Sequence, residues 1–268
     1  MRLTVIGCSP AWPNPGRANA GYLVEGPGRL LLDCGPGVLS RLRAHAEAWP
    51  QVDAIVLSHL HLDHWGDVLA WLWGTVAGPG AEVAPPEIWL ARGQRSELLE
   101  IAARLGDNGM LRRRFQVVEY PLEEPFQVAG FQALAVPVAH YTMATCGLRL
   151  SDGASTLAYS ADTGPTQALA RLAHGADLFL CEATLADDAP DGPPRGHLSA
   201  AEAVAAHEAS GAARLLLTHR PVELPQPAGV EVAVEGLSFE LSEAGQGPRA
   251  AGRSPAQSRA ESHGDAAP

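Results

Sequence analysis

The 268-residue sequence predicts one α/β domain in which two mixed sheets pack face to face with helices outside. The first observation is segment order: a β-rich block, an α/β passage, a second β-rich block and a final α/β passage. The second is composition, because 46% hydrophobic and 18% charged residues form an ordinary globular balance that supports a sizeable core. The third is that several apolar strands end in histidine or aspartate.

The first half begins with three predicted strands separated by proline- and glycine-rich turns, at Leu3–Gly7, Gly21–Val24 and Arg29–Asp33. The glycines and proline of residues 35–37 interrupt the chain before a helix expected over Val38–Ala48, and a buried strand follows at Ala54–Leu57. The remaining elements of this half are a helix at Val68–Trp73, a strand at Glu87–Leu90, a helix at Ser96–Leu105 and a strand at Phe115–Tyr120.

The second half opens with four predicted strands, at Pro125–Val128, Phe131–Val138, Thr145–Leu150 and Thr156–Tyr159. Helices and strands then alternate: helix Thr166–Ala173, strand Leu178–Cys181, helix Ser199–Ser210, strand Arg214–Leu217, and two short strands near Val230–Val234 and Ser238–Leu241. From residue 245 the chain has almost no large apolar side chain, so it cannot form a core. We therefore expect the domain at residues 1–244 and a disordered tail at residues 245–268.

Charge and cysteine content restrict the class of partner. The net charge is −11, whereas a long nucleic acid favours a broad positive face, and the only dense basic run is Arg112–Arg114. The four cysteines are scattered, which is typical of buried thiols in a reducing compartment: Cys8, Cys34, Cys146 and Cys181. No apolar stretch approaches the roughly 20 residues of a membrane span. We expect a cytoplasmic protein with a small ligand and no membrane contact.

The segment Ser58–His64 carries the strongest functional signal. It holds three histidines and an aspartate directly after an apolar strand. His59 and His61 are two residues apart and can point the same way, whereas Asp63 and His64 begin the next turn and can face a second point. Imidazole and carboxylate are ligands of zinc and similar ions, and burying four such groups without a metal or partners would be costly. The segment predicts more than one metal.

Three further ligand-type side chains follow apolar strands later in the chain. His140 follows residues 133–139, Asp162 follows residues 157–161, and His219 follows residues 215–218. One such placement is unremarkable because turns are polar. With His59 the arrangement occurs four times, which indicates strands that converge on one site.

These residues, in this order, resemble the metallo-β-lactamase superfamily, and specifically its ribonuclease-Z-like phosphodiesterase branch. The resemblance also includes residues 3–9, 31–37, 159–163, 181–184, 196–199 and 217–219. It implies a four-layer αβ/βα sandwich. It also implies two divalent metal ions, with zinc preferred and manganese or iron as alternatives.

The resemblance assigns His59, His61 and His140 to the first metal. It assigns Asp63, His64 and His219 to the second metal, with Asp162 bridging the two. A hydroxide held between the ions would attack phosphorus, which also gives Asp63 a place among the catalytic residues.

His197 precedes an expected helix start, with Ser199 in the N-cap position and Glu202 three residues on. In the family, a histidine at this place contacts the scissile phosphate and helps to protonate the leaving group. Glu182 resembles the carboxylate that orients this imidazole. The structural alternatives are a loop histidine near a helix cap and a solvated glutamate at a strand end.

Three functions remain open. The favoured one is a phosphodiesterase for a small substrate such as a 3′,5′-cyclic nucleotide. The second is tRNA 3′ processing, which the net charge and the lack of a lysine-rich arm between His64 and His140 disfavour. The third is thioester or lactone hydrolysis, which the surroundings of His140 disfavour. The resemblance also leaves a homodimer open.

Overall fold

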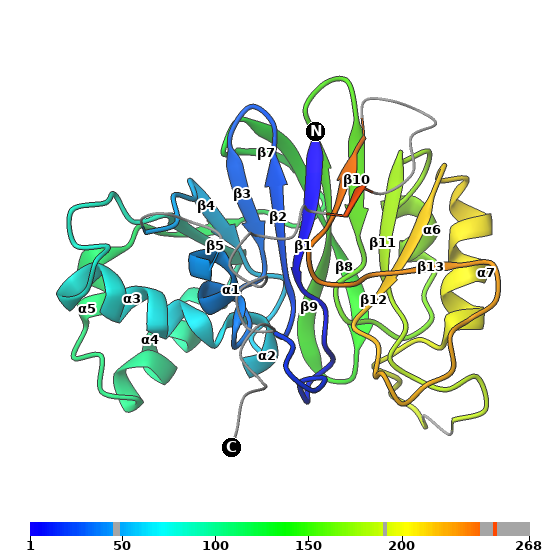
Figure 1. Ribbon diagram of the computed structural model, residues 1–268, viewed down its shortest axis with the longest axis horizontal. Helices are drawn as coiled ribbons and strands as arrows, with labels where there is room; N and C mark the ends of the chain where they lie inside the picture. The colour runs from blue at the N-terminus through cyan, green and yellow to red at the C-terminus, as the bar shows by residue number, and fades with distance from the viewer. Residues whose placement is uncertain (45–48, 190–191, 242–248, 251–268) are drawn as a thin grey trace, which may run out of the picture.

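The strands form two sheets, which Figure 1 shows side by side. The computed structural model describes residues 1–44, 49–189, 192–241 and 249–250. The strands of the first sheet are β1 (Arg2–Gly7), β2 (Gly21–Glu25), β3 (Arg29–Leu32), β4 (Ala54–Val56), β5 (Glu87–Ala91), β6 (Val117–Tyr120), β14 (Leu237–Glu240) and β15 (Arg249–Ala250). Their order across the sheet is β15-β14-β1-β2-β3-β4-β5-β6.

The second sheet is built mainly from the later part of the chain. Its strands are β7 (Pro125–Val128), β8 (Phe131–His140), β9 (Met143–Ser151), β10 (Thr156–Tyr159), β11 (Leu178–Glu182), β12 (Leu215–Thr218) and β13 (Glu231–Val232). Their order is β13-β12-β11-β10-β9-β8-β7. Both sheets combine parallel and antiparallel pairs, so the predicted pair of mixed sheets is confirmed.

Helices cover the outer face of each sheet (Figure 1). The described helices are α1 (Val38–Ala44), α2 (Leu62–Trp65), α3 (Asp67–Ala77), α4 (Arg95–Arg104), α5 (Met110–Arg114), α6 (Ala168–Leu172) and α7 (Ala200–Ser210). Helices α1, α3, α4 and α5 lie beside the first sheet, and α6 and α7 lie beside the second. None of them is long and apolar enough to cross a membrane.

Alternation of side chains along the strands separates three apolar clusters. In β3, Leu30 and Leu32 belong to the cluster between the sheets, whereas Leu31 belongs to the cluster shared with α1, α3 and α4. Phe179 of β11 likewise packs outward with Leu172 of α6. Successive side chains of a strand point to opposite faces, so the apolar run Leu30–Leu32 of β3 is buried on both sides. The result is the predicted four-layer sandwich.

Strand direction decides where the polar strand ends meet. Strands β10, β11 and β12 are parallel, and β8 runs with them because β8 and β10 are both antiparallel to β9. The carboxyl ends of these four strands therefore lie at one edge of the second sheet. In the first sheet, β4 is parallel to β3 and β5. The segment Ser58–His64 follows the carboxyl end of β4.

Several predicted boundaries require correction. The helix predicted over Val38–Ala48 is described only to Ala44, and its last four residues lie outside the described residues. The helix α5 was missed, and the Arg112–Arg114 run forms its last turn. Strands β8 and β9 extend to His140 and from Met143, so only two residues join them. Most of the expected tail at residues 245–268 also lies outside the described residues, although Arg249–Ala250 pairs with β14.

Candidate metal centre

The segment that follows β4 is held in place by the turn between β3 and α1. The backbone N–H of Ser58 donates to Oδ1 of Asp33 at 2.7 Å, and the Ser58 hydroxyl donates to Oδ2 at 2.9 Å. The N–H of Cys34 donates to the carbonyl of His64 at 2.7 Å. A Cβ at Gly35 would come within 1.9 Å of the Asp63 carbonyl, so this close approach requires glycine.

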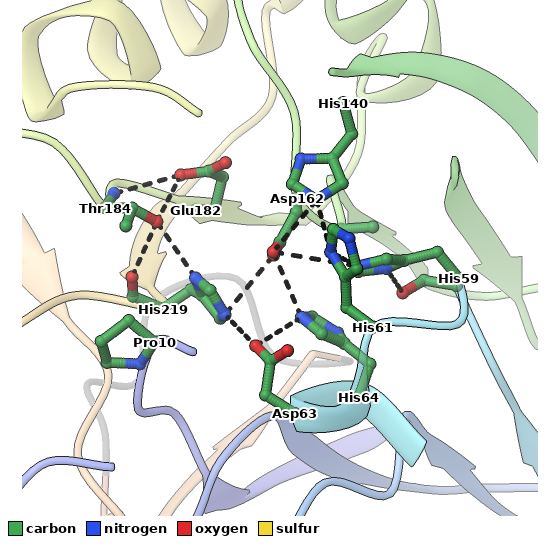
Figure 2. A network of polar contacts seen from close by, with 12 residues as sticks. Pro10, His59, His61, Asp63, His64, His140, Asp162, Glu182, Thr184 and His219 are labelled. Carbon is green, nitrogen blue, oxygen red and sulfur yellow. Dashed lines mark hydrogen bonds and ion pairs between the residues drawn. The ribbon is translucent and has the colours of Figure 1, made fainter. Parts of the chain in front are cut away.

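The structure brings all seven predicted metal-ligating residues together, as Figure 2 shows. One group contains His59, His61, His140 and Asp162, and the other contains Asp63, His64, His219 and Asp162. Within each group, the potential ligand atoms lie within 4.8 Å of one another. Asp162 belongs to both groups, which is the arrangement expected of a carboxylate between two metal ions.

In the first group, imidazole nitrogens face one another at short range. Nδ1 of His61 lies 3.1 Å from Nε2 of His59 and 2.9 Å from Nε2 of His140. Burial lowers the pKa of all three imidazoles, which favours their neutral forms. Neutral imidazole carries the lone pair that binds a metal, so burial favours the form of these residues that can act as ligands.

In the second group, carboxylates and imidazoles are tightly paired. Nε2 of His219 lies 3.1 Å from Oδ2 of Asp63. Burial opposes ionisation of Asp63, but contacts with His219 and His64 outweigh it and hold the pKa of this carboxyl well below its usual range. Burial also lowers the pKa of His64, but the charges of Asp162 and Asp33 prevail and raise it. The group thus carries ionised carboxylates that attract a cation.

Two buried atoms in the centre lack hydrogen-bond partners among the described residues: Nε2 of His64 and Oδ1 of Asp162. Nε2 of His64 lies 3.3 Å from carboxylate oxygens of both Asp63 and Asp162 without forming a hydrogen bond of good geometry. Buried polar atoms without partners are costly. Their position among nitrogen and carboxylate donors fits divalent metal ions, and the two ligand groups offer a place for two such ions.

Polar partners behind the histidines orient the imidazole rings. Nδ1 of His140 donates to the carbonyl of Gly196 at 2.7 Å, and Nδ1 of His64 donates to Oδ2 of Asp33 at 2.8 Å. Asp33 is fully buried and also accepts the hydroxyl of Tyr159 at 2.7 Å. Such contacts set which ring nitrogen carries the proton and leave the other nitrogen for a metal.

Thr184 has the corresponding role for His219. Its Oγ1 lies 3.0 Å from Nδ1 of His219 and 2.8 Å from Oε2 of Glu182 (Figure 2). The hydroxyl can accept from the imidazole while it donates to the carboxylate. It therefore connects the metal-binding cluster with Glu182.

His197 and Glu182 form a pair beside the metal-binding cluster. Nδ1 of His197 lies 2.9 Å from Oε1 of Glu182, and Glu182 is fully buried. The alternative of a solvated strand-end glutamate is therefore wrong for Glu182. Ser199 caps α7, and its capping box with Glu202 is present as predicted. His197 lies just before this cap, so the helix start fixes its position.

The backbone is strained at several of these positions. Asp33, Ala161 and His219 are non-glycine residues with φ of 58°, 53° and 53°. Such left-handed conformations cost about 1–3 kcal/mol each and cluster at functional sites. His219 belongs to the centre, Ala161 directly precedes Asp162, and Asp33 orients His64.

A pocket of about 470 Å³ opens over the centre. His61, Asp63, Asp162 and His197 line it together with Ala11, Asn19, Pro36, Leu62 and Tyr141. The lining residues come from both halves of the sandwich. The volume lies in the range of small-molecule sites.

Sequence reasoning missed the contacts that support the centre. Tyr159 and Thr184 lie in the segments that carry the family resemblance, but nothing in their spacing reveals what their hydroxyls contact. Tyr141 was not singled out at all, and its position directly after His140 was the available signal.

Comparison with known proteins agrees with this architecture. A model of the family described as "Beta-lactamase superfamily domain" matches residues 28–220. An uncharacterized protein of Mycobacterium leprae is 36% identical over 230 residues, which cover 82% of this chain and 78% of that protein. A ribonuclease Z of Mycobacterium bovis is 31% identical over 243 residues, with 82% and 85% covered.

A probable metallo-hydrolase of Bacillus subtilis, YhfI, is 31% identical over 227 residues, covering 82% of this chain and 87% of that protein. The crystal structure of YhfI superposes with a TM-score of 0.75 at 25% identity, covering 89% of this chain and 98% of that structure. Together with the His/Asp centre, these similarities indicate a metal-dependent hydrolase enzyme. The chain belongs to the beta-lactamase superfamily, among the metallo-hydrolases related to ribonuclease Z.

Proposed function

We propose that this protein is a dinuclear-metal phosphodiesterase that hydrolyses a small substrate such as a 3′,5′-cyclic nucleotide. The observation that carries the proposal is the sharing of Asp162 between two ligand groups at the floor of a 470 Å³ pocket that His197 also lines. Such a pocket suits one small phosphodiester held against two cations and a histidine.

In this proposal, His59, His61 and His140 would hold one ion, and Asp63, His64 and His219 would hold the other. Asp162 belongs to both groups and would serve both ions. Bound divalent cations supply Lewis acidity, which lowers the pKa of water and neutralises charge on phosphate oxygens. Mixed nitrogen and carboxylate donors suit zinc, with manganese or iron as alternatives. Asp63 has a second role, because its carboxylate helps to set the charge of the pocket floor.

His197 provides the proton for the leaving oxygen. Glu182 accepts from Nδ1 of His197, so Nε2 is the nitrogen that serves the pocket. A carboxylate beside the ring stabilises the protonated imidazole, which is the form that acts as general acid. Glu182 is thus a positioning residue, and His197 is the catalytic residue.

The structure of the segment between His64 and His140 supports a small substrate over a tRNA. The structure describes all of residues 65–139, and they fold into α3, β5, α4, α5, β6, β7 and β8 without an inserted arm. The net charge of −11 also disfavours a long polyanion. The four cysteines are free and buried, which suits a cytoplasmic enzyme.

The similarity to ribonuclease Z favours tRNA 3′ processing as a second candidate. Purified protein loaded with zinc or manganese is therefore assayed with 3′,5′-cyclic AMP, a precursor tRNA and a thioester. We expect hydrolysis of the cyclic nucleotide that Asp162→Ala abolishes and that Asp188→Asn, at an exposed aspartate, retains. Clean tRNA cleavage or thioester hydrolysis with an inert cyclic nucleotide would replace the proposal by the corresponding alternative.

A further inference from the structure

Tyr141 occupies an unusual place beside the candidate centre. It is the first of the two residues that join β8 to β9, directly after His140. Its φ is 46°, a left-handed conformation that hairpin turns normally assign to glycine, asparagine or aspartate. A bulky residue with positive φ is an outlier, and such outliers gather where a side chain has a function. The turn alone does not explain a tyrosine here.

Contacts with the segment before α7 fix the tyrosine ring. The backbone N–H of Tyr141 donates to the carbonyl of Arg195 at 3.2 Å. The ring packs so closely on Gly196 that a Cβ there would lie 2.2 Å from it. Its centroid is 5.1 Å from the ring of His140 and 5.6 Å from the ring of His197. The tyrosine ring is therefore held at a defined distance beside the candidate metal centre.

The ring is nevertheless available to a ligand. Tyr141 is 44% exposed and lines the pocket over the centre. The first half of the sandwich contributes Ala11, Pro36 and Leu62 to the same pocket, and Leu62 is 61% exposed. A large exposed leucine and a large exposed tyrosine at one small pocket provide apolar area above a polar floor.

The charge of the pocket also favours a ligand that has an uncharged aromatic part. Its described lining contains two carboxylates and no arginine. The phosphate of a substrate therefore depends on the metal ions at the floor, and the rest of the substrate meets apolar and aromatic surface. A flat uncharged ring matches this division, because bases stack on aromatic side chains.

We propose that Tyr141 is a specificity-determining residue that stacks on the base of a nucleotide substrate. The substrate class is accordingly a phosphodiester that bears an aromatic base, and not a sugar phosphodiester alone. This inference rests on the proposed function, because it assumes that the phosphate binds at the candidate metal centre.

Binding of adenosine 5′-monophosphate and ribose 5-phosphate to the zinc-loaded protein, measured by calorimetry, tests the inference. The wild type should bind the nucleotide more tightly. Tyr141→Ala should weaken nucleotide binding roughly 5- to 150-fold and leave ribose 5-phosphate unchanged, as expected for loss of one base–aromatic stack. Tyr141→Phe should retain binding. Trp73→Ala removes an aromatic residue of α3 that is 49% exposed and does not line the pocket, and it should change neither affinity.

Turnover of 3′,5′-cyclic AMP separates the two proposals. Tyr141→Ala should raise KM by a similar factor with little change in kcat. If the wild type hydrolyses the cyclic nucleotide and Tyr141→Ala keeps its KM and its nucleotide affinity, the stacking role is wrong and the proposed function stands. If the wild type is inert but its preference for the nucleotide depends on Tyr141, the stacking role stands and the proposed function is wrong.

Discussion

Nδ1 of His197 donates to Oε1 of Glu182 across 2.9 Å. Further hydrogen bonds fix the orientation of the Glu182 carboxylate. Oε1 also accepts the N–H of Thr163 at 2.8 Å, and Oε2 accepts the N–H and the hydroxyl of Thr184. A buried carboxylate with this many donors cannot rotate without losing hydrogen bonds. The orientation of His197 is thus set by a rigid group that does not itself line the pocket.

His197→Ala should keep its bound metal and lose turnover by about 10²–10⁴-fold, because only the proton donor is removed. Metal content by mass spectrometry and kcat on the preferred substrate measure the two effects. His207→Ala, at a half-buried histidine in the last turn of α7, is the matched control and should keep both. Full activity of His197→Ala would reduce His197 to a structural residue of the helix cap.

Thr184→Val should weaken metal binding by about 10–100-fold, because valine keeps the shape but removes the oxygen that meets Nδ1 of His219. Thr184→Ser restores the hydroxyl and should restore the affinity. Competition with a chelator measures the effect without any assay of activity. Equal metal affinity of the valine and serine variants would show that the 3.0 Å contact does not orient His219.

The free energy of unfolding should fall as the pH rises above about 9. Burial raises the pKa of the Cys8 thiol from 9.0 to about 12 and that of Cys146 to about 11. The unfolded chain then loses its thiol protons near pH 9, whereas the folded chain keeps them. The free energy of unfolding is therefore highest below about pH 9 and falls as the pH rises towards 11–12. Each such thiol contributes a loss of up to about 1.4 kcal/mol per pH unit.

Urea unfolding of the metal-free protein at pH 8.0 and at a series of higher values checks this slope. Cys8→Ala should flatten it, because one raised thiol pKa is removed. The buried hydroxyl of Tyr159, whose pKa burial raises well above 10.0, adds to the same trend at higher pH. A free energy of unfolding that is constant from pH 8 to 10.5 would contradict the prediction.

The sequence was sufficient where the chemistry is local. Four of the seven candidate ligands lie between His59 and His64, so one strand and one turn carry them whatever the rest of the chain does. Ser199 and Glu202 are likewise three residues apart, and their capping box appears as predicted. Short-range geometry follows directly from sequence spacing.

Boundaries and isolated residues were harder to predict. The helix α5 has only five residues, and its arginine run resembles a solvated loop in the sequence. Tyr141 has the conformation of a glycine-like turn residue, which its side chain gives no reason to expect. In both cases packing against distant segments outweighs local preference.

Taken alone, the sequence determined the alternation of strands and helices, the two-sheet sandwich and the identity of the candidate ligands, because apolar periodicity and local motifs encode them. Only the tertiary structure decided that His140, Asp162 and His219 meet His59–His64 around a shared carboxylate, since that depends on the common direction of β8, β10 and β12. It also decided the contacts of Thr184 and Tyr141. Thr184 contacts His219, 35 positions further along the chain, and Tyr141 contacts Arg195, 54 positions further along. Contacts between residues so far apart in sequence are fixed by tertiary packing and not by sequence spacing.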